Sequence, residues 1–201
     1  MKKFFSTLTL ALISLTLCSQ SLSKTQILVL ATPHLKQLDG MQAEYLNRVT
    51  DRLKSIDFDA VAIENMPVEL LFDIKSRTGD HWKELYGYYN KRIEIGKSFQ
   101  KILDISYEDA LEKLEELNQK ETFEDKERAD YIDYLLCSYD IWSATLHYKL
   151  IDDTSLLKNE AINILKVYSN SMNEINVIGL EIASHNSIRQ VSYIDNLQDE
   201  T

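Results

Sequence analysis

The chain has 201 residues, with 22 Lys and Arg against 32 Asp and Glu, and a formal net charge of −10 at pH 7. A hydrophobic content of 44% excludes intrinsic disorder, which combines low hydrophobicity with high net charge. The low content of Gly and Pro, 5 and 2 residues, excludes collagen-like, low-complexity and turn-dense β-sandwich sequences. The acidic balance argues against nucleic acid or an anionic membrane surface as partner, because both attract Lys and Arg. Composition therefore predicts an acidic globular protein with a core of ordinary size.

Residues 1–23 have the pattern of an export signal peptide. Two lysines precede an apolar segment over residues 4–17, and small residues at Ser21 and Ser23 offer a cleavage position before Lys24. The apolar segment has about 14 residues, which is short for a membrane span, so no transmembrane anchor is expected. We therefore predict an exported protein, periplasmic or secreted.

The two cysteines bear on how the mature chain is held together. Cys18 offers a lipoprotein alternative, because Leu15-Thr16-Leu17-Cys18 resembles a lipobox, but Leu17 stands where a lipobox normally has a small residue. Removal of residues 1–23 leaves a net charge of −12, from 20 basic and 32 acidic residues, and Cys137 as the one cysteine. An internal disulfide is then excluded, and apolar neighbours predict a buried, unreactive thiol at Cys137.

Three segments predict strands of a parallel sheet. The apolar run over residues 26–31 and the shorter run over 60–63 are typical of strands buried on both faces. Helical spacing over residues 41–56 separates them, so the chain is expected to start as a βαβ unit with a right-handed crossover. Residues 190–194 predict a third strand near the C-terminus. The predicted fold class is α/β, a small parallel sheet with a large helical insertion.

The middle of the chain, about residues 67–185, is predicted to be almost wholly helical. Capping residues and apolar spacing place helices over residues 81–103, 106–119, 126–150 and from a cap at Thr154 or Ser155 to about 184. After the signal peptide we expect one α/β domain over residues 24–201. The chain ends six residues after Asp195, which is short for an architecture with so many helices on so thin a sheet.

Three polar residues follow the three predicted strands: His34, Glu64 and Asp195. Ligands of parallel α/β sheets bind outside the carboxyl ends of the strands, and neighbouring strands lie only ~4.8 Å apart. A histidine with carboxylates suits divalent-metal binding or general acid–base catalysis. The alternative is that each residue only ends its strand, Glu64 as a helix cap and Asp195 in an Asx turn.

Residues 24–64 resemble the opening of the TraB/Tiki/erythromycin-esterase-like superfamily, which includes the haem-binding ChaN proteins. Those proteins begin with a buried strand, a G-T-x-H motif, a helix and a second strand that ends in Glu. Here the stretches are Leu28-Val29-Leu30-Ala31-Thr32-Pro33-His34, with Ala31 where the family usually has Gly, and Val61-Ala62-Ile63-Glu64. The N-E-x-x-x-x-G pattern of residues 173–179 and the later Tyr193-Ile194-Asp195 resemble an uncharacterised bacterial branch of that superfamily.

The resemblance implies hydrolysis of an amide or ester in a small-molecule or peptide substrate, assisted by a metal or by His and Glu. It implies His34 and Glu64 as the catalytic pair, with Glu174 and Asp195 as supporting carboxylates. Together the four would bind a divalent metal ion or orient water. In a metal-free version, His34 acts as base and Glu64 orients the imidazole or activates water. The second His-bearing loop of Tiki-like members has no counterpart, which fits a C-terminally short chain.

The aromatic residues over 131–148 suggest a different class of function. They form core or subunit contacts, or they belong to a non-catalytic binding module that holds a small apolar ligand such as haem, or a protein partner. A family member with only a structural role is the third possibility. Among the other histidines, His147 is expected to be packed, and His81 and His185 to lie near helix ends. The sequence lacks G-x-S-x-G, P-loop, G-x-G-x-x-G, H-E-x-x-H and C-x-x-C motifs, which excludes the common enzymes built on them.

Overall fold

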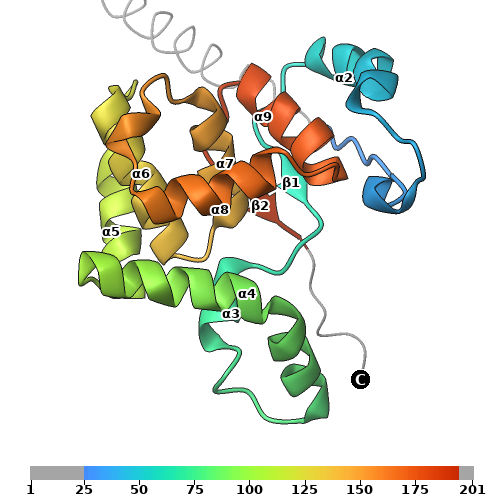
Figure 1. The fold of residues 1–201 in the computed structure, drawn as a ribbon. Coiled ribbons are helices and arrows are strands. Elements are labelled where there is room, and N and C mark those ends of the chain that lie inside the picture. The colour runs from blue at the N-terminus through green and yellow to red at the C-terminus, as the bar shows by residue number, and fades with distance from the viewer. Residues whose placement is uncertain (1–24, 195–201) are drawn as a thin grey trace, which may run out of the picture. The chain divides into compact units, whose positions relative to one another are not determined.

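The computed structural model describes residues 25–194, and the segments 25–32 and 33–194 belong to two separate units. The described residues are mostly helical, with eight α-helices and a two-stranded parallel sheet (Figure 1). No helix among them is long and apolar enough to cross a membrane. The expected signal peptide over residues 1–23 and the candidate residue Asp195 lie outside the described part.

The sheet consists of β1, Ala62–Ile63, and β2, Ser192–Tyr193. The strands are parallel, with Ala62 opposite Ser192 and Ile63 opposite Tyr193, and the amide of Ile194 donates to the carbonyl of Ile63 at 3.1 Å. The predicted strands at 60–63 and 190–194 are therefore confirmed, although each is only two residues long.

The predicted strand over residues 26–31 is wrong, and with it the βαβ start. Residues 25–34 have no regular structure, and Ile27 and Val29 are 83% and 86% exposed. An apolar run becomes a strand only where a neighbouring edge accepts its backbone hydrogen bonds. Within the described part of the chain, no backbone hydrogen bond involves residues 25–32. β1 is itself buried on one face alone, because Ala62 is exposed and Ile63 is buried, so the expectation of strands buried on both faces is also wrong.

The predicted helix at 41–56 is confirmed as a short 3₁₀ turn, η2, Ala43–Leu46, which continues into α2, Asn47–Lys54. A further 3₁₀ turn, η1, spans Leu35–Gln37. The helical middle is also confirmed, as the elements α3 Val68–Asp73, α4 Asp80–Leu103, α5 Tyr107–Asn118, α6 Asp125–Cys137, α7 Ile141–Leu150, η3 Thr154–Leu156, α8 Asn159–Ser169, η4 Ile175–Gly179 and α9 Leu180–His185. The start of α5 is fixed by a capping box, in which Ser106 Oγ accepts from the Asp109 amide and Asp109 Oδ2 accepts from the Ser106 amide, both at 3.0 Å.

The two longest predicted helices are each interrupted. The helix expected over 126–150 is α6 and α7, because Tyr139 has a positive φ of 66° and the side chain of Asp140 accepts from the Ser143 amide at 3.0 Å to start α7. The helix expected from 154 to 184 is η3, α8, η4 and α9, and η4 is a π-helical segment. The carbonyl of Tyr139 at the first break accepts from the distant Arg92, whereas the second break is accompanied by local hydrogen bonds of Asn170, Asn173 and Asn176.

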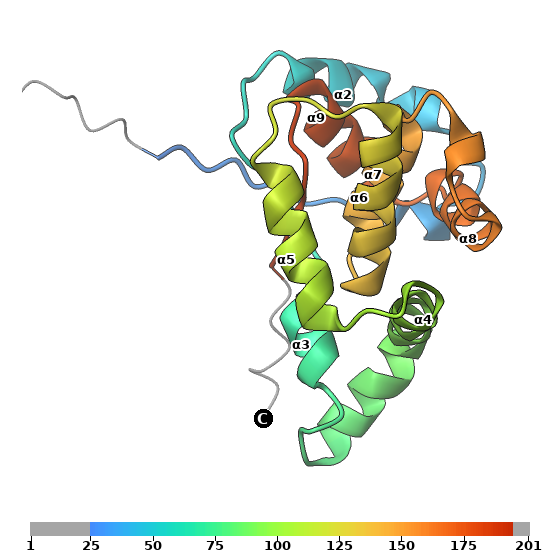
Figure 2. The same cartoon turned by 90° about the vertical axis from the view of Figure 1, so that its left-hand side faces the viewer.

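The core forms where α6 packs against α4, α5 and α7, and α7 packs in turn against α8 and α9. Figure 2 shows α5 and α6 side by side, with α4 passing across their ends. In the same unit, β1 contacts η4, and the amide of Val191, just before β2, donates to Ser143 Oγ of α7 at 3.1 Å. A smaller apolar cluster joins α3 to α4 through Met66, Leu71, Ile74, Tyr89 and Ile93. The sheet is thus a small element within a mostly helical unit, and Glu64 directly follows its strand β1.

Candidate functional site

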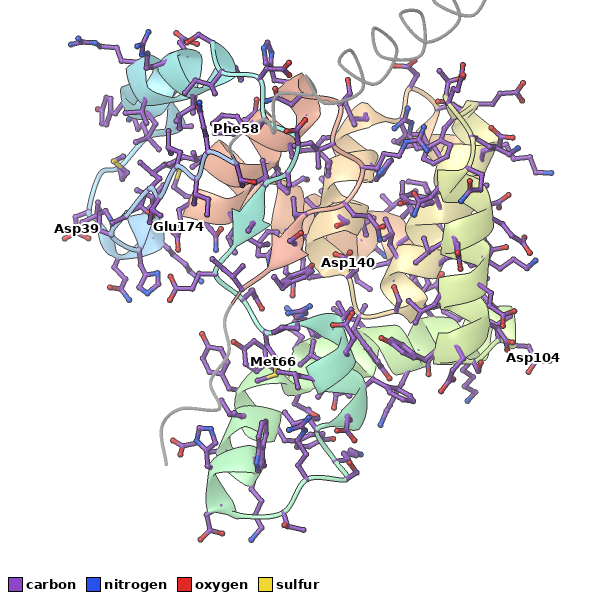
Figure 3. All side chains as sticks on the ribbon, turned by 180° about the vertical axis from the view of Figure 1, so that it is seen from behind. Asp39, Phe58, Met66, Asp104, Asp140 and Glu174 are labelled. Atoms are coloured by element: carbon purple, nitrogen blue, oxygen red, sulfur yellow. The ribbon has the colours of Figure 1, made fainter. Side chains whose placement is uncertain are left out.

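His34 and Glu174, two of the four predicted site residues, are in direct contact. Nδ1 of His34 lies 2.9 Å from Oε1 of Glu174, and the backbone amide of Leu35 donates to Oε2 at 3.2 Å. Both carboxylate oxygens are therefore engaged by the segment that carries the histidine. Figure 3 shows Glu174 on the side of the unit where the chain near Asp39 runs, so the contact joins the start of this unit to a segment near its end.

Glu174 is held at the entrance of the π-helical segment η4. The side chain of the preceding Asn173 accepts hydrogen bonds from the amides of Ile175 at 2.7 Å and Asn176 at 3.3 Å, and so satisfies donors at the helix start. π-helical turns are rare and are frequently found at functional sites. The two residues that open the N-E-x-x-x-x-G pattern therefore have different roles: Asn173 caps the turn, and Glu174 contacts His34.

The electrostatics of the pair favour its charged form. The pKa of His34 is raised, mainly by its hydrogen bond to Glu174, then by the charge of Glu174, and to a smaller degree by the charge of Glu64. Burial of Glu174 would raise its own pKa, but hydrogen bonds from His34 and from backbone amides outweigh burial, so the pKa of Glu174 is lowered. His34 is 65% exposed at its side chain and Glu174 only 22%, so the histidine can meet a ligand while the carboxylate is shielded.

Glu64 leaves the carboxyl end of β1 and is exposed. Its charge acts on His34, as the raised pKa indicates, but the carboxylate that contacts the imidazole is Glu174. The orienting role that the sequence suggested for Glu64 is therefore filled by Glu174. Asp195 lies one residue beyond the described part of the chain.

A buried arginine that the sequence reasoning missed lies directly behind this strand end. Arg92, on α4, is 6% exposed and donates from Nη1 to the side chain of Asn65 and, at 3.1 Å, to the carbonyl of Met66. Its Nε and Nη2 donate to the carbonyl of Tyr139 at 3.2 and 2.9 Å. Arg92 thus ties the residue after Glu64 to the break between α6 and α7. The only signal in the sequence was one basic residue on an apolar face of the helix at 81–103.

A second buried group, Asp140, lies next to this arginine. It accepts a hydrogen bond from the hydroxyl of Tyr193 at the end of β2, and the charge of Arg92 acts on it. Burial raises the pKa of Asp140, against the effect of these partners. The network of Arg92, Asp140 and Tyr193 connects the carboxyl ends of both strands to α4 and to the start of α7.

The donor set suits a divalent cation only in part. Imidazole nitrogen and carboxylate oxygens are ordinary ligands of such ions, and Glu174 holds the second nitrogen of His34 as carboxylates commonly do behind a ligating histidine. Within residues 25–194, however, no group of three or more His, Cys, Asp or Glu is placed to hold a metal ion. Of the four predicted ligands, His34 and Glu64 are the exposed ones, and Asp195 lies outside the described residues.

The other residues considered in the sequence, namely His147, Cys137 and the aromatic residues of 131–148, include side chains buried in the core. His147 is 2% exposed, and its Nε2 pairs with the carbonyl of Arg189 at 2.9 Å, as expected for a packed histidine. Cys137 is fully buried, and burial raises the pKa of its thiol to about 12. The aromatic side chains of Tyr131, Tyr139 and Trp142 are at most 5% exposed and lie in the core clusters. None of the three lines either of two surface clefts, one at residues 57–59 and 186–190 and one between α2 and α9.

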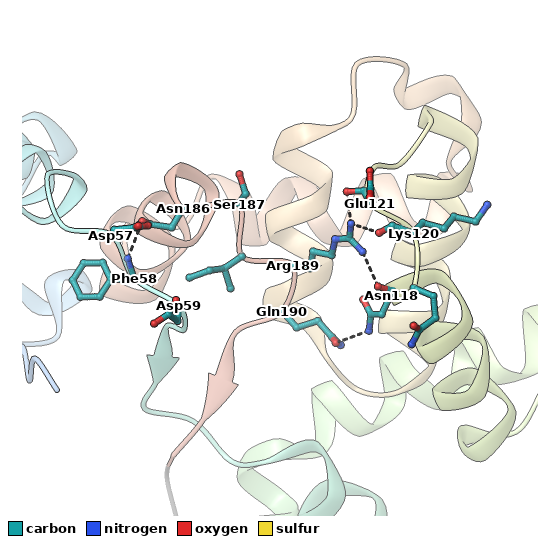
Figure 4. Close-up of a pocket in the computed structure, with 12 residues that line it drawn as sticks. Asp57, Phe58, Asp59, Asn118, Lys120, Glu121, Asn186, Ser187, Arg189 and Gln190 are labelled. Atoms are coloured by element: carbon teal, nitrogen blue, oxygen red, sulfur yellow. Dashed lines mark hydrogen bonds between the residues drawn. The ribbon is translucent and has the colours of Figure 1, made fainter. Parts of the chain in front are cut away.

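The larger cleft, about 810 Å³, lies at the opposite, amino ends of the strands, between residues 57–59 and 186–190 (Figure 4). Several of its polar groups are already hydrogen-bonded within the chain. Arg189 donates to the carbonyls of Asn118, Lys120 and Glu121, and the side chain of Asn186 accepts from the Phe58 amide at 3.0 Å. The cleft is therefore a junction between segments and contains none of the predicted site residues.

Comparison with protein-family models, curated proteins and solved structures found no match to this chain. Any functional assignment must therefore be argued from the geometry of His34, Glu174 and Glu64.

Proposed function

We propose that this chain is an exported hydrolase of amides or esters, of the TraB/Tiki-like kind, with His34 as its general base. The observation that carries the proposal is the 2.9 Å contact between Glu174 Oε1 and His34 Nδ1. A carboxylate behind one ring nitrogen fixes the tautomer and leaves the other nitrogen to accept a proton. Within the described chain Nε2 of His34 has no hydrogen-bond partner, and the side chain is mostly exposed.

In the proposed reaction, Nε2 of His34 takes a proton from a water molecule as the water attacks the carbonyl carbon of the substrate. Glu174 stabilises the imidazolium that results, and the Leu35 amide keeps the carboxylate in place. His34 then returns the proton to the leaving amine or alcohol, so the base is regenerated. In this proposal Glu64, which follows β1, orients the water.

A divalent ion would bind to Nε2 of His34 and the carboxylate of Glu64, with Asp195 as a further carboxylate. Such an ion lowers the pKa of a bound water and polarises a carbonyl. Metal content of the purified protein, measured by elemental analysis with and without His34→Ala, distinguishes this version from the metal-free one.

The test of hydrolysis is a panel of p-nitrophenyl esters and peptide anilides offered to the mature protein, with His34→Ala and Glu174→Gln as variants. We expect activity to be lost in the first variant and reduced by about 10²-fold or more in the second. His185→Ala is the matched control, because His185 is an exposed histidine at the end of α9, outside the site. Equal activity in His34→Ala and His185→Ala would refute the proposal. Export is tested separately, by N-terminal sequencing of the protein recovered outside the cytoplasm, which should begin at Lys24.

A further inference from the structure

A second cleft, the α2–α9 pocket, has neither His34 nor Glu174 in its lining, and none of the roles above uses it. Its volume is about 490 Å³, within the ~300–1,000 Å³ typical of small-molecule sites. Its lining comes from α2, the last residues of α7 and α8, and the segment η4–α9. Residues near position 50, Lys149 and residues 169–181 therefore contribute to one small cavity.

Two cations and two anions line this pocket. Lys149 Nζ lies 2.7 Å from Glu181 Oε1, and Lys54 Nζ lies 3.3 Å from Glu181 Oε2. The three side chains are 29–38% exposed, so their charges are accessible to a ligand. Asp51 of α2 is the second anion of the lining. The lining is thus charge-balanced, with positive and negative groups side by side.

The inner wall of the pocket includes a polar group with unused capacity. Asn176 is 4% exposed, and its Nδ2 donates to the carbonyls of Ser169 at 2.8 Å and Ser171 at 2.9 Å. Its Oδ1 accepts no hydrogen bond from any described residue. An unsatisfied buried acceptor is unfavourable and calls for a donor. Asn176 also lies within η4, the π-helical segment, and the carboxyl end of α8 beside it favours positive charge.

We propose that the α2–α9 pocket binds a zwitterion with adjacent amino and carboxylate groups, namely a free amino acid or a short peptide. The carboxylate of the ligand pairs with Lys149 and Lys54. The ammonium pairs with Glu181 and Asp51 and brings N–H donors to the side of the pocket where Asn176 lies. A simple anion would have to displace Glu181 from both lysines, whereas a zwitterion keeps every charge paired. The inference does not depend on hydrolysis at His34.

The experiment uses L-alanyl-L-alanine as probe and the mature protein, with binding followed by NMR chemical shifts. N-acetyl-dialanine lacks the ammonium, and dialanine amide lacks the carboxylate. We expect the zwitterion to bind at least about tenfold more tightly than either blocked peptide, and to shift the resonances of Asn176 and Val177. Lys149→Met and Glu181→Gln should each weaken binding about tenfold or more.

The matched controls are Lys113→Met and Glu116→Gln, which break an exposed ion pair of 2.8 Å on α5. They should leave the affinity unchanged, and so should His34→Ala, which separates this site from the proposed hydrolysis. Lys54→Met serves as a second variant should Lys149→Met fail to fold by circular dichroism. Equal binding of all three peptides, or no shift at about 10 mM probe, tenfold above the 1 mM Kd that corresponds to about −4.1 kcal/mol, would overturn the inference.

Discussion

Nδ1 of His34 and Oε1 of Glu174 lie 2.9 Å apart although 140 positions separate the two residues in the sequence. The pair is asymmetric, because the carboxylate is shielded and doubly hydrogen-bonded while the imidazole is exposed. A proton on His34 is therefore stabilised by a group that solvent does not fully screen.

Replacing Glu174 by Gln should lower the pKa of His34, because both the hydrogen bond to the carboxylate and its negative charge raise that pKa in the native protein. The measurement is an NMR titration of the His34 ring protons. Glu116→Gln, at an exposed site on α5, should leave the titration of His34 unchanged. A His34 titration that is the same in wild type and Glu174→Gln would show that the contact does not form in solution.

Stability should fall in acid because of His147. Its pKa is lowered to about 4, chiefly by burial, against about 6.5 for an ordinary histidine. Between these values the unfolded chain binds a proton that the folded chain does not, so the free energy of unfolding decreases as the pH falls from about 6.5 to about 4. The full contribution is about 3 kcal/mol. Urea unfolding of wild type and His147→Gln across this range measures it, and the variant should show the shallower pH dependence.

Two glycines of α4 should respond oppositely to replacement by alanine. A Cβ at Gly96 would collide with the ring of the buried Tyr139, so Gly96→Ala should destabilise the protein by roughly 1–3 kcal/mol. Gly87 has open space around the same position, and Gly87→Ala should stabilise by about 0.4–1 kcal/mol. Urea denaturation of the two variants provides the comparison. A stabilising Gly96→Ala would contradict the packing of Tyr139 on α4.

Arg92→Met should be among the most damaging single changes. It leaves the carbonyls of Met66 and Tyr139 and the side chain of Asn65 without their donor, at a cost of roughly 2–5 kcal/mol. Arg92→Lys should recover only part of this loss, because one ammonium cannot span the same acceptors. The exposed Arg52→Met on α2 is the control and should change the free energy of unfolding by less than about 0.5 kcal/mol.

Local patterns predicted those parts of the fold that depend on neighbouring residues. The capping box at Ser106, the helix of residues 41–56 and both strands of the sheet follow from side chains within a few positions of one another. The break at Tyr139 was not predictable in this way, because a positive φ there is accompanied by hydrogen bonds from Arg92, which belongs to another helix. The apolar run at 26–31 had the right composition for a strand but no partner in the described chain.

The residues of the candidate site could be predicted from local sequence, but the contacts between them could not. His34 and Glu64 were marked by their positions at predicted strand ends, and Glu174 by a motif that resembles a known branch. The pairing of His34 with Glu174 rather than Glu64, and the role of Arg92 behind the strand end, depend on contacts between distant segments. No periodicity in one sequence encodes which of two carboxylates reaches an imidazole.

The parallel pairing of β1 with β2 has a consequence for how the protein matures. The pairing of Ala62 with Ser192 and the contact of His34 with Glu174 both join segments that are far apart in sequence. The helices α4 to α8, in contrast, can form and pack from contacts between neighbouring elements. Contacts between residues so distant in sequence carry the largest loop-closure entropy and tend to form late. We therefore expect the unfolded chain to collapse first into a helical intermediate, with the pair at residues 34 and 174 assembled only when the final segment closes.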